Sequence, residues 1–285
     1  MNINSNSKTL CLLGHPVSQS FSPSIQNHLF KKYNLNKLYV CFNVKENNLG
    51  DSIDGIKALG ILGGNITIPH KVNVIEYLDW VDENSRLIGA VNTFKNEDGI
   101  LKGYNTDGKG FVKSIIDKGY DLNNKKIMVL GAGGASRSIC IELASRGVEI
   151  IYIRNRSIEK PKEISEAIMT NFDTKVSCSV DKIKREDLDN IDILINTTPI
   201  GMGTCECPID EAIVPSNNLL VCDIVYKPHN TQLLKWASKH KLQVIYGIDM
   251  LINQGLEAFH IWTGIKPIKE DEDEIKHIYE ASINI

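Results

Sequence analysis

A glycine-rich turn after the apolar residues 127–130 carries the residue types that point most directly to chemistry. Gly131 permits a tight turn between a strand and a helix, and Gly133 lets the backbone approach a pyrophosphate at the positive N-terminus of that helix. The third position of the dinucleotide fingerprint holds Ser136 rather than glycine or alanine, so an ordinary strand-to-helix turn is the alternative. Because the glycines lie between a clear strand and a helix expected over 135–146, the sequence predicts a dinucleotide site.

The end of the next predicted strand, residues 149–153, indicates which dinucleotide this is. A site selective for NAD would place an Asp or Glu there to bind the 2′-hydroxyl of the adenosine ribose. This chain has Asn155 and Arg156 instead, and their side chains suit a 2′-phosphate. The sequence therefore predicts NADP rather than NAD.

Small polar side chains stand at the ends of several predicted elements in the first hundred residues. Ser20 and Ser22 lie between a strand and a helix N-terminus, which suits a carboxylate, although Ser22 would serve equally as a helix N-cap. Lys71 follows the third strand, where an open α/β sheet binds ligands at its carboxyl edge. Asn92 and Asp107 end further elements. Each of these residues, taken alone, is more typical of a turn, a cap or a solvated surface.

The elements that position these residues predict an α/β protein of two domains. The chain of 285 residues exceeds the usual size of one domain, and short apolar strands alternate with amphipathic helices, which is typical of mostly parallel sheets. We expect an N-terminal three-layer α/β domain and a Rossmann domain, with the active site in the cleft between them. Two helices that follow residue 247 need a partner surface, so the substrate-binding domain is expected to be discontinuous, residues 1–106 with 247–285. Residues 107–246 are expected to form the NADP-binding domain.

Three local expectations accompany this architecture. A helix is predicted to start with Ser22 as N-cap and Pro23 as its first residue. The turn residues 96–99 predict a β-hairpin, which we place at a sheet edge. The acidic run 270–274 near a helix start is interpreted as a solvated face.

Composition limits the classes of partner. The 32 Lys and Arg residues nearly balance the 35 Asp and Glu residues and form no basic stripe, which argues against nucleic acid or an anionic membrane as partner. Neither a signal-like N-terminus nor an 18-residue apolar run is present, so a cytoplasmic protein is expected. Cys205 and Cys207 lack a second pair at metal spacing, so no metal site is expected. Reduced core thiols are expected for the remaining cysteines: Cys11, Cys41, Cys140, Cys178 and Cys222.

Nine segments taken in order resemble one known family. They are GHPVSQSFSP, GGNITIPHK, GAVNT, GYNTDGKG, GAGGAS, NRS, NTTPIGM, DIVYKP and GIDMLINQG, and they span residues 14 to about 262. In this order they are similar to the shikimate dehydrogenases and the related quinate/shikimate dehydrogenases. The resemblance implies reversible hydride transfer between NADPH and the ring ketone of 3-dehydroshikimate, which gives shikimate for chorismate and aromatic amino-acid biosynthesis.

The resemblance also implies roles for individual residues. Lys71 and Asp107 match the catalytic pair, but whether Lys71 donates the proton or mainly positions and polarises the carbonyl is left open. Lys160 stands where the family often has Arg. The lysine ammonium is a point charge, so it would hold a 2′-phosphate less specifically than the forked guanidinium of Arg. Eight positions match the substrate site: Ser20, Ser22, Asn65, Thr67, Asn92, Asp107, Tyr226 and Gln254. The cofactor site is matched by Gly131, Ala132, Gly133, Gly134, Ala135, Asn155, Arg156, Ser157, Lys160, Thr198, Ile224, Gly247 and Met250.

Two other functions are alternatives. One is a quinate/shikimate dehydrogenase that uses NAD or NADP. Thr67, where that branch can carry Ser, and the triplet beginning at Asn155 argue against it. The other is a non-catalytic NADP-sensing module, which would have no need of Lys71 or Asp107. A small-molecule substrate is the expected partner, and the sequence leaves a monomer or a homodimer open.

Overall fold

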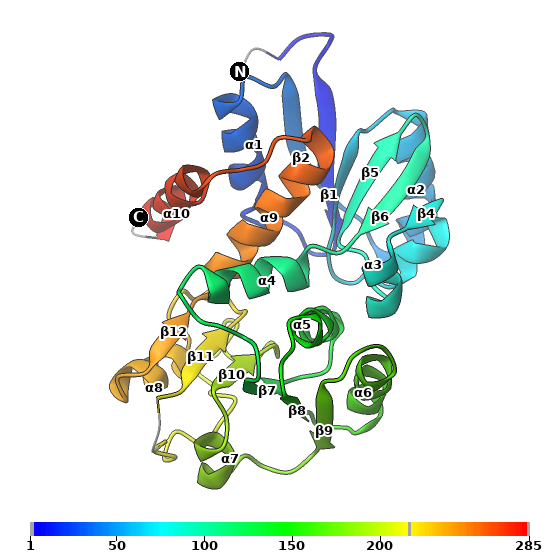
Figure 1. The fold of residues 1–285 in the computed structure, drawn as a ribbon. Coiled ribbons are helices and arrows are strands. Elements are labelled where there is room, and N and C mark those ends of the chain that lie inside the picture. Colours follow the sequence, from blue (N-terminus) through cyan, green and yellow to red (C-terminus); the bar gives the residue numbers. More distant parts are fainter. Residues whose placement is uncertain (1–2, 216–217, 284–285) are drawn as a thin grey trace. The chain divides into compact units, whose positions relative to one another are not determined.

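The computed structural model describes residues 3–215 and 218–283, and it divides the chain into two compact α/β units (Figure 1). The first unit contains the residues up to Thr106 and those from Ile252 onward, and the second contains Asp107–Leu251. The division runs through helix α9 (Gly247–Thr263), so the first turn of that helix belongs to the second unit. Within these described ranges, no helix combines the length and the apolar character needed to span a membrane.

The first unit is built on a six-stranded, mostly parallel sheet with the strand order β2-β1-β3-β5-β6-β4. β1 lies between two parallel partners, and β5 pairs antiparallel with both β3 and β6. Because the chain moves to opposite sides of β1, the loops after β1 and β3 meet at a switch point, where α/β sheets bind ligands. The strands are β1 (Lys8–Gly14), β2 (Lys37–Asn43), β3 (Gly63–Ile66), β4 (Trp80–Val81), β5 (Thr93–Glu97) and β6 (Ile100–Tyr104).

Strand register assigns the helices of this unit to the two faces of the sheet. Cys11 and Leu13 of β1 pack in one core cluster with Ile53 of α2 (Leu49–Ala58), so α2 covers that face. Leu10, which points the other way, is the register partner of Tyr39, and the Tyr39 ring contacts Trp262 of α9 with centroids 5.9 Å apart. Helices therefore cover both faces, and the expected three-layer arrangement with a mostly parallel sheet is confirmed.

Two local expectations for the first unit are wrong by small margins. Helix α1 (Ser22–Lys32) begins one residue early, with Phe21 rather than Ser22 in the N-cap position and no side-chain cap. The predicted hairpin of β5 and β6 exists, but the sheet edge beyond it is β4, whose two residues are too few to show a pattern in the sequence. Two 3-10 helices, Glu46–Asn48 and Asn73–Tyr77, and α3 (Glu83–Ile88) complete the connections up to β5.

The acidic run at the start of α10 (Lys269–Ile283) is not the solvated face that the sequence suggested. Asp271 has a fully buried side chain, lies 2.9 Å from the Lys32 ammonium and accepts a hydrogen bond of 2.7 Å from the Tyr33 hydroxyl. Glu274 pairs with His28 at 2.8 Å. Two residues of the run, Asp271 and Glu274, thus fasten α10 to α1 and its C-terminal end, and α10 packs against α1 in Figure 1.

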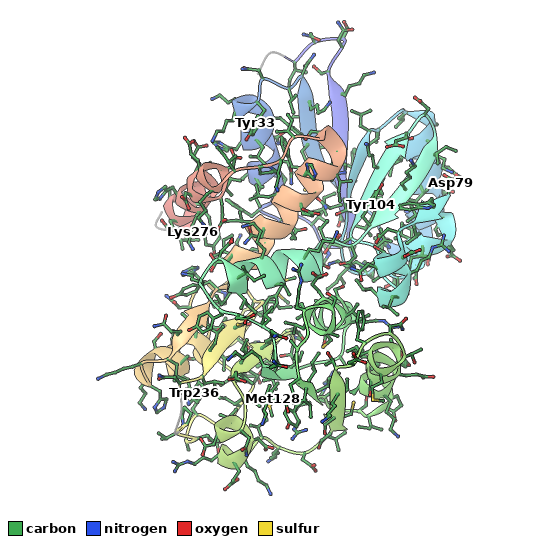
Figure 2. All side chains as sticks on the ribbon, in the orientation of Figure 1. Tyr33, Asp79, Tyr104, Met128, Trp236 and Lys276 are labelled. Atoms are coloured by element: carbon green, nitrogen blue, oxygen red, sulfur yellow. The ribbon has the colours of Figure 1, made fainter. Side chains whose placement is uncertain are left out.

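The second unit contains a six-stranded, fully parallel sheet with the order β9-β8-β7-β10-β11-β12. Numbered within the unit, this is 3-2-1-4-5-6, the Rossmann order, so the predicted Rossmann fold is confirmed. Met128 of β7 and Trp236 of α8 lie in its core (Figure 2). The strands are β7 (Lys126–Leu130), β8 (Ile150–Arg154), β9 (Lys175–Ser179), β10 (Ile193–Asn196), β11 (Leu220–Asp223) and β12 (Gln243–Ile245). The helices are α4 (Asp107–Ile116), α5 (Gly134–Ser145), α6 (Glu159–Asn171), α7 (Arg185–Asp189) and α8 (Gln232–Lys239).

Candidate active site

A buried chain of amide and hydroxyl groups crosses the carboxyl end of the first sheet. The Asn65 Oδ1 atom accepts a hydrogen bond of 2.7 Å from the Tyr39 hydroxyl, and its Nδ2 atom donates to the Asn92 carbonyl at 3.2 Å and to the Thr93 hydroxyl at 2.9 Å. Since a carbonyl only accepts hydrogen bonds, it fixes which end of the Asn65 amide faces it. Asn65 therefore keeps one oxygen lone pair for a further donor.

Asn92 continues this chain toward helix α9. Its Oδ1 atom accepts from the Thr106 backbone N–H at 2.8 Å and from the Thr93 hydroxyl at 2.9 Å. Its Nδ2 atom donates to the Thr106 hydroxyl at 3.0 Å and to the Gln254 Oε1 atom at 3.3 Å. The fold thus brings together three of the predicted substrate residues, Asn65, Asn92 and Gln254, all of them buried.

The first turn of α1 and the loop after β3 place three more predicted residues in the same unit. The Ser20 hydroxyl accepts from the Ser22 backbone N–H at 3.2 Å, so Ser20 covers an otherwise open donor at this helix start. Ser22 itself makes no cap bond, which removes the purely structural explanation for its hydroxyl. Gly14 is the last residue of β1, and a Cβ atom on it would stand 2.3 Å from the Thr67 side chain. Glycine is therefore required where the end of β1 approaches the loop after β3.

Lys71 lies four residues after Thr67, with a partly exposed side chain. Its carbonyl accepts from the Val91 backbone N–H at 2.8 Å, and Val91 precedes Asn92. Lys71 is thereby anchored beside the amide network of the first unit. Asp107 is the first residue of α4 and of the second unit, and it is buried. The second unit also contains Tyr226, whose pKa is raised by burial.

The glycine turn after β7 has the geometry that a dinucleotide requires. Gly131 has φ of +103°, a backbone conformation that favours glycine, and a Cβ there would lie 2.8 Å from the Thr197 hydroxyl. A Cβ on Gly133 or Gly134 would meet no atom within 4 Å, so the backbone at the start of α5 is open. Ser136, the departure from the fingerprint, donates to the Gly131 carbonyl at 2.8 Å and so stabilises the turn from inside.

The loop after β8 carries the residues predicted for the 2′-phosphate. Asn155 donates to the Ser157 carbonyl at 3.0 Å, which closes the loop, and Arg156 and Lys160 are exposed. The Arg154 carbonyl at the end of β8 accepts from the Gly131 N–H at 2.8 Å, so this loop adjoins the glycine turn. No carboxylate stands at the end of β8 itself, because that position is Arg154. The residues present therefore fit a phosphorylated ribose better than a free 2′-hydroxyl.

The remaining cofactor residues follow the other half of the second sheet. The Thr198 hydroxyl donates to Asn196 Oδ1 at 2.7 Å. A Cβ on Gly247 would lie 2.5 Å from the Ile224 carbonyl, so the start of α9 approaches that loop closely. Met250 is buried in α9.

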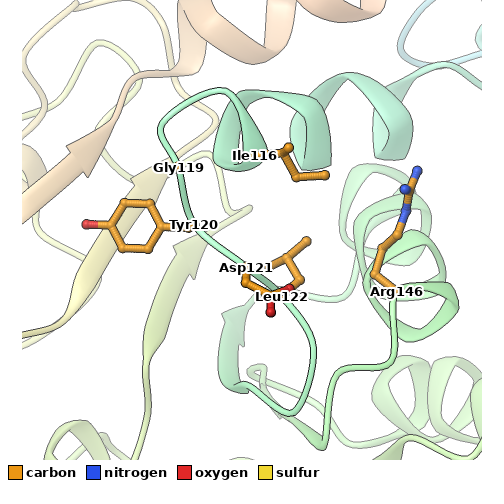
Figure 3. Close-up of a pocket in the computed structure, with 6 residues that line it drawn as sticks. All are labelled: Ile116, Gly119, Tyr120, Asp121, Leu122 and Arg146. Atoms are coloured by element: carbon orange, nitrogen blue, oxygen red, sulfur yellow. The ribbon is translucent and has the colours of Figure 1, made fainter.

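The second unit also has a pocket of about 460 Å³ whose lining contains none of these residues. It is lined by Ile116, Gly119, Tyr120, Asp121, Leu122 and Arg146, none of which is a predicted site residue (Figure 3). The side chains of Ile116, Leu122 and Arg146 surround it in Figure 3, and Arg146 is paired with Glu142 at 2.7 Å.

Across the described residues, no group of three His, Cys, Asp or Glu side chains could hold a metal ion.

The structure also points to residues that the sequence patterns did not mark. Tyr39, Thr93 and Thr106 complete the amide network, yet in the sequence Tyr39 resembles any apolar strand residue. Thr93 and Thr106 directly follow Asn92 and Asn105, within the GAVNT and GYNTDGKG segments. Both threonines lie inside segments that carry the family resemblance, so their place next to Asn92 and Asn105 was the available signal; nothing local marks Tyr39.

A Rossmann unit with an open glycine turn, together with a unit whose sheet carries buried hydroxyl and amide groups, defines a nicotinamide-dinucleotide-binding protein of two α/β domains. Family models match three segments: a shikimate dehydrogenase substrate binding domain over residues 12–94, shikimate / quinate 5-dehydrogenase over 112–224, and a shikimate 5′-dehydrogenase C-terminal domain over 247–270. The chain belongs to the shikimate dehydrogenase family, and the resemblance stated from the sequence is confirmed.

Individual relatives agree with this assignment. A shikimate dehydrogenase (NADP(+)) of Caldanaerobacter subterraneus subsp. tengcongensis is 46% identical over 267 residues, covering 93% of this chain and 94% of that protein. The shikimate 5-dehydrogenase of Listeria monocytogenes, solved with shikimate and NAD, has a TM-score of 0.89 at 32% identity, with 98% of both chains covered. A solved shikimate dehydrogenase in complex with NADP+ has a TM-score of 0.87 at 43% identity, with 96% of both chains covered.

Proposed function

We propose that this chain catalyses the reversible reduction of 3-dehydroshikimate to shikimate with NADPH, a step toward chorismate and the aromatic amino acids. The observation that carries the proposal is the buried network around Asn92 in a chain whose relatives are named shikimate dehydrogenases. A polyhydroxylated ring needs paired hydrogen-bonding groups, because each buried hydroxyl left unpaired costs about 1 to 3 kcal/mol.

The residues of the first unit divide the substrate among them. Ser20 and Ser22, at the start of α1, bind the ring carboxylate, because hydroxyl and backbone N–H donors and the helix N-terminus all favour an anion there. Tyr226 joins them from the second unit. Asn65, Thr67, Asn92 and Gln254 of the first unit are assigned to the ring hydroxyls, together with Asp107 of the second unit.

Lys71 and Asp107 act at the ring carbonyl. Negative charge grows on the carbonyl oxygen during reduction, and the Lys71 ammonium stabilises that charge or donates a proton to it. Asp107 is assigned to accept a hydrogen bond from the neighbouring ring hydroxyl and so to orient the substrate. We therefore assign Lys71 and Asp107 as the catalytic pair.

The second unit holds the cofactor, NADP(H), which supplies the hydride. Gly131, Ala132, Gly133, Gly134 and Ala135 leave backbone N–H groups open to the pyrophosphate at the start of α5. Arg156 and Lys160 bind the 2′-phosphate, together with Asn155 and Ser157. Thr198, Ile224, Gly247 and Met250 surround the nicotinamide and its ribose.

The domain assignment and the location are part of the proposal. Residues 1–106 with 247–285 are assigned to the substrate-binding domain and residues 107–246 to the NADP-binding domain. Gly247 and Met250, which are assigned to the cofactor, belong to the part of the first range that lies in the second unit. All seven cysteines are free thiols, which supports a reducing, cytoplasmic setting.

A substrate-by-cofactor matrix tests this function. Absorbance at the nicotinamide band is followed with shikimate and with quinate, each offered NADP+ and NAD+. The expected result is turnover of shikimate with NADP+ at an efficiency at least about tenfold above that with NAD+, equivalent to about 1.4 kcal/mol. Equal efficiency with NAD+, or faster turnover of quinate, would instead favour a quinate/shikimate dehydrogenase. Cofactor binding without turnover of either ring acid would favour an NADP-sensing module.

A further inference from the structure

The carboxylate of Asp223 lies at the carboxyl end of β11, which is flanked by β10 and the edge strand β12 of the second sheet. Its residue is 1% exposed, and its register partner on β10 is Asn196, the last residue of that strand. Three neutral donors reach it: Asn196 Nδ2 at 2.9 Å, the Val225 N–H at 3.0 Å and the Thr231 hydroxyl at 2.7 Å. None of the sequence motifs assigned a role to this side chain.

Each donor ties down a different segment. Asn196, while it donates to Asp223, accepts from both the N–H and the hydroxyl of Thr198, at 3.1 and 2.7 Å. The Val225 N–H donates back to the Asp223 carboxylate, and this hydrogen bond stabilises the turn that directly follows β11. Thr231 is the N-cap of α8, where its hydroxyl accepts from the Leu234 N–H.

The loop that follows Asp223 is in close contact with the start of α9. A Cβ on Gly247 would lie 2.5 Å from the Ile224 carbonyl oxygen and 2.6 Å from the Val225 carbonyl carbon. The position of this loop therefore has little freedom to change without moving the helix start. Thr198, Ile224 and Gly247 are the residues assigned above to the nicotinamide end of the cofactor.

We propose that Asp223 is a positioning residue for the nicotinamide half of the cofactor site. Its carboxylate holds the loop after β10 and the loop after β11 at a fixed separation, and so sets where Thr198 and Ile224 meet a bound dinucleotide. This inference rests on the proposed cofactor function and adds a residue that does not itself touch the cofactor.

The ionised form of Asp223 is the one that accepts all three hydrogen bonds. Burial raises its pKa to about 6, despite the bonds from Thr231, Val225 and Asn196, which favour the charged form. The titratable groups nearest to it are thiols: burial raises the pKa of Cys222 far above its ordinary value and that of Cys207 to about 11. His229 of the same loop stacks on the ring of Tyr246. The Asp249 carboxylate of α9 contributes to the raised pKa of Cys222. Lys235 and Lys239 of α8 are exposed to solvent.

The variant Asp223→Asn tests the proposal, because it keeps the acceptor for Asn196 and Val225 but offers Thr231 a donor where an acceptor was. The dissociation constant of NADP+ is measured by calorimetry on the full chain at about pH 8 and about pH 5, on either side of the carboxyl pKa. Asp192→Asn is the matched control, since Asp192 accepts from the Lys126 N–H near the opposite end of β10.

At the higher pH, Asp223→Asn is expected to weaken NADP+ binding about tenfold, or about 1.4 kcal/mol, without lowering the thermal midpoint. At the lower pH the two dissociation constants should agree within about twofold, because wild-type Asp223 is then protonated as well. Titration of the 2′-phosphate cancels in this ratio. Asp192→Asn should match the wild type at both pH values.

Unchanged NADP+ affinity in Asp223→Asn at the higher pH would overturn the proposal. So would a weakening that persists unchanged at the lower pH or that accompanies a fall in thermal midpoint, since those results describe a merely structural residue. Failure of the proposed function is recognised separately, in the wild type, by the absence of shikimate-dependent NADP+ reduction.

Discussion

Single side chains decide what the first unit accepts. Asn65 gives both amide hydrogens to the Asn92 carbonyl and the Thr93 hydroxyl and takes one hydrogen from Tyr39. Its unused capacity is a single oxygen lone pair, which matches a hydroxyl donor and not a carbonyl. If Asn65 binds the ring as proposed, a ring acid that lacks a hydroxyl at this point leaves that lone pair without a donor, and we propose that Asn65 discriminates between ring acids in this way.

Replacement of Lys71 by alanine tests the catalytic assignment. We expect kcat to fall at least about a hundredfold, because general acid or charge stabilisation at the carbonyl is lost. The KM for NADP+ should stay within about twofold of wild type, since Lys71 belongs to the first unit. Steady-state kinetics with shikimate measures both, and Lys31→Ala, on the exposed side of α1, is the control. Near wild-type turnover in Lys71→Ala would contradict the assigned role.

Arg156→Gln addresses the cofactor phosphate. We expect the catalytic efficiency with NADPH to fall about tenfold or more, while that with NADH stays unchanged, because only NADPH carries the charge that Arg156 binds. Initial rates with the two cofactors measure the ratio, and the exposed Arg185 of α7 supplies the control Arg185→Gln. An equal loss with both cofactors would place Arg156 outside the phosphate site.

Among the elements, strand β2 links the middle of α1 to β3. The Asn27 side chain of α1 makes two hydrogen bonds to the Tyr39 backbone. Its Nδ2 atom donates to the carbonyl at 2.9 Å, and its Oδ1 atom accepts from the N–H at 2.8 Å. The Tyr39 hydroxyl then fixes Asn65 on β3. The proposed carboxylate and hydroxyl subsites are therefore connected by three hydrogen bonds through one tyrosine.

Tyr39→Phe removes only the last of these hydrogen bonds. We expect the KM for shikimate to rise about fivefold to tenfold, because Asn65 loses one of its three hydrogen bonds and its oxygen loses one of its two donors, at a cost of about 1 to 3 kcal/mol. The KM for NADP+ should not change. Kinetics with either substrate varied gives the two values, and Tyr33→Phe, which loses a hydroxyl bond to Asp271 instead, is the matched control. A parallel rise in both KM values would indicate general damage to the fold.

Periodicity in the sequence was sufficient to predict the strands and helices that carry the site, because each is long enough to repeat its pattern. β4 was missed because two residues contain no period. Ser22 was assigned as the N-cap because the Ser-Pro pattern does not reveal that the Phe21 backbone starts the helix. The Tyr39–Asn65 bond could not be predicted, since alternation tells which face a side chain takes but not what it meets there.

At the scale of the whole molecule, the first unit is held together by contacts between distant parts of the chain. The Trp262 indole donates to the Phe94 carbonyl at 2.9 Å, and Gln26 donates to the Gly255 carbonyl at 2.9 Å. Asp271 joins α10 to Lys32 of α1. The burial of this acidic residue was not predictable from its neighbours, which are themselves acidic, because its partner is far away in sequence.

Asp271→Asn is expected to lower the free energy of unfolding by about 2 kcal/mol, because it removes a buried, hydrogen-bonded charge. Burial alone would raise the pKa of Asp271, but bonds from Lys32, the Ile268 backbone and Tyr33 outweigh it and hold the pKa below 3.8. This stabilisation is therefore full above the unfolded pKa and is lost as pH falls through the folded pKa. Urea unfolding at neutral and acidic pH measures it. The exposed Asp273→Asn should have no effect, and an equal loss in both variants would contradict the argument.

The discontinuity of the first unit has a consequence for biosynthesis. Its sheet is translated before the second unit, but the helix residues that close its core, including Phe259 and Trp262, are translated after the second unit. All of the residues of the second unit are synthesised before the first unit can be completed. At roughly 5 to 20 residues per second, the sheet of the first unit must therefore wait for α9 while the whole second unit is translated. Transiently exposed strands of this kind are the ones that aggregate or bind chaperones, so this interval is where the fold is most exposed to misfolding.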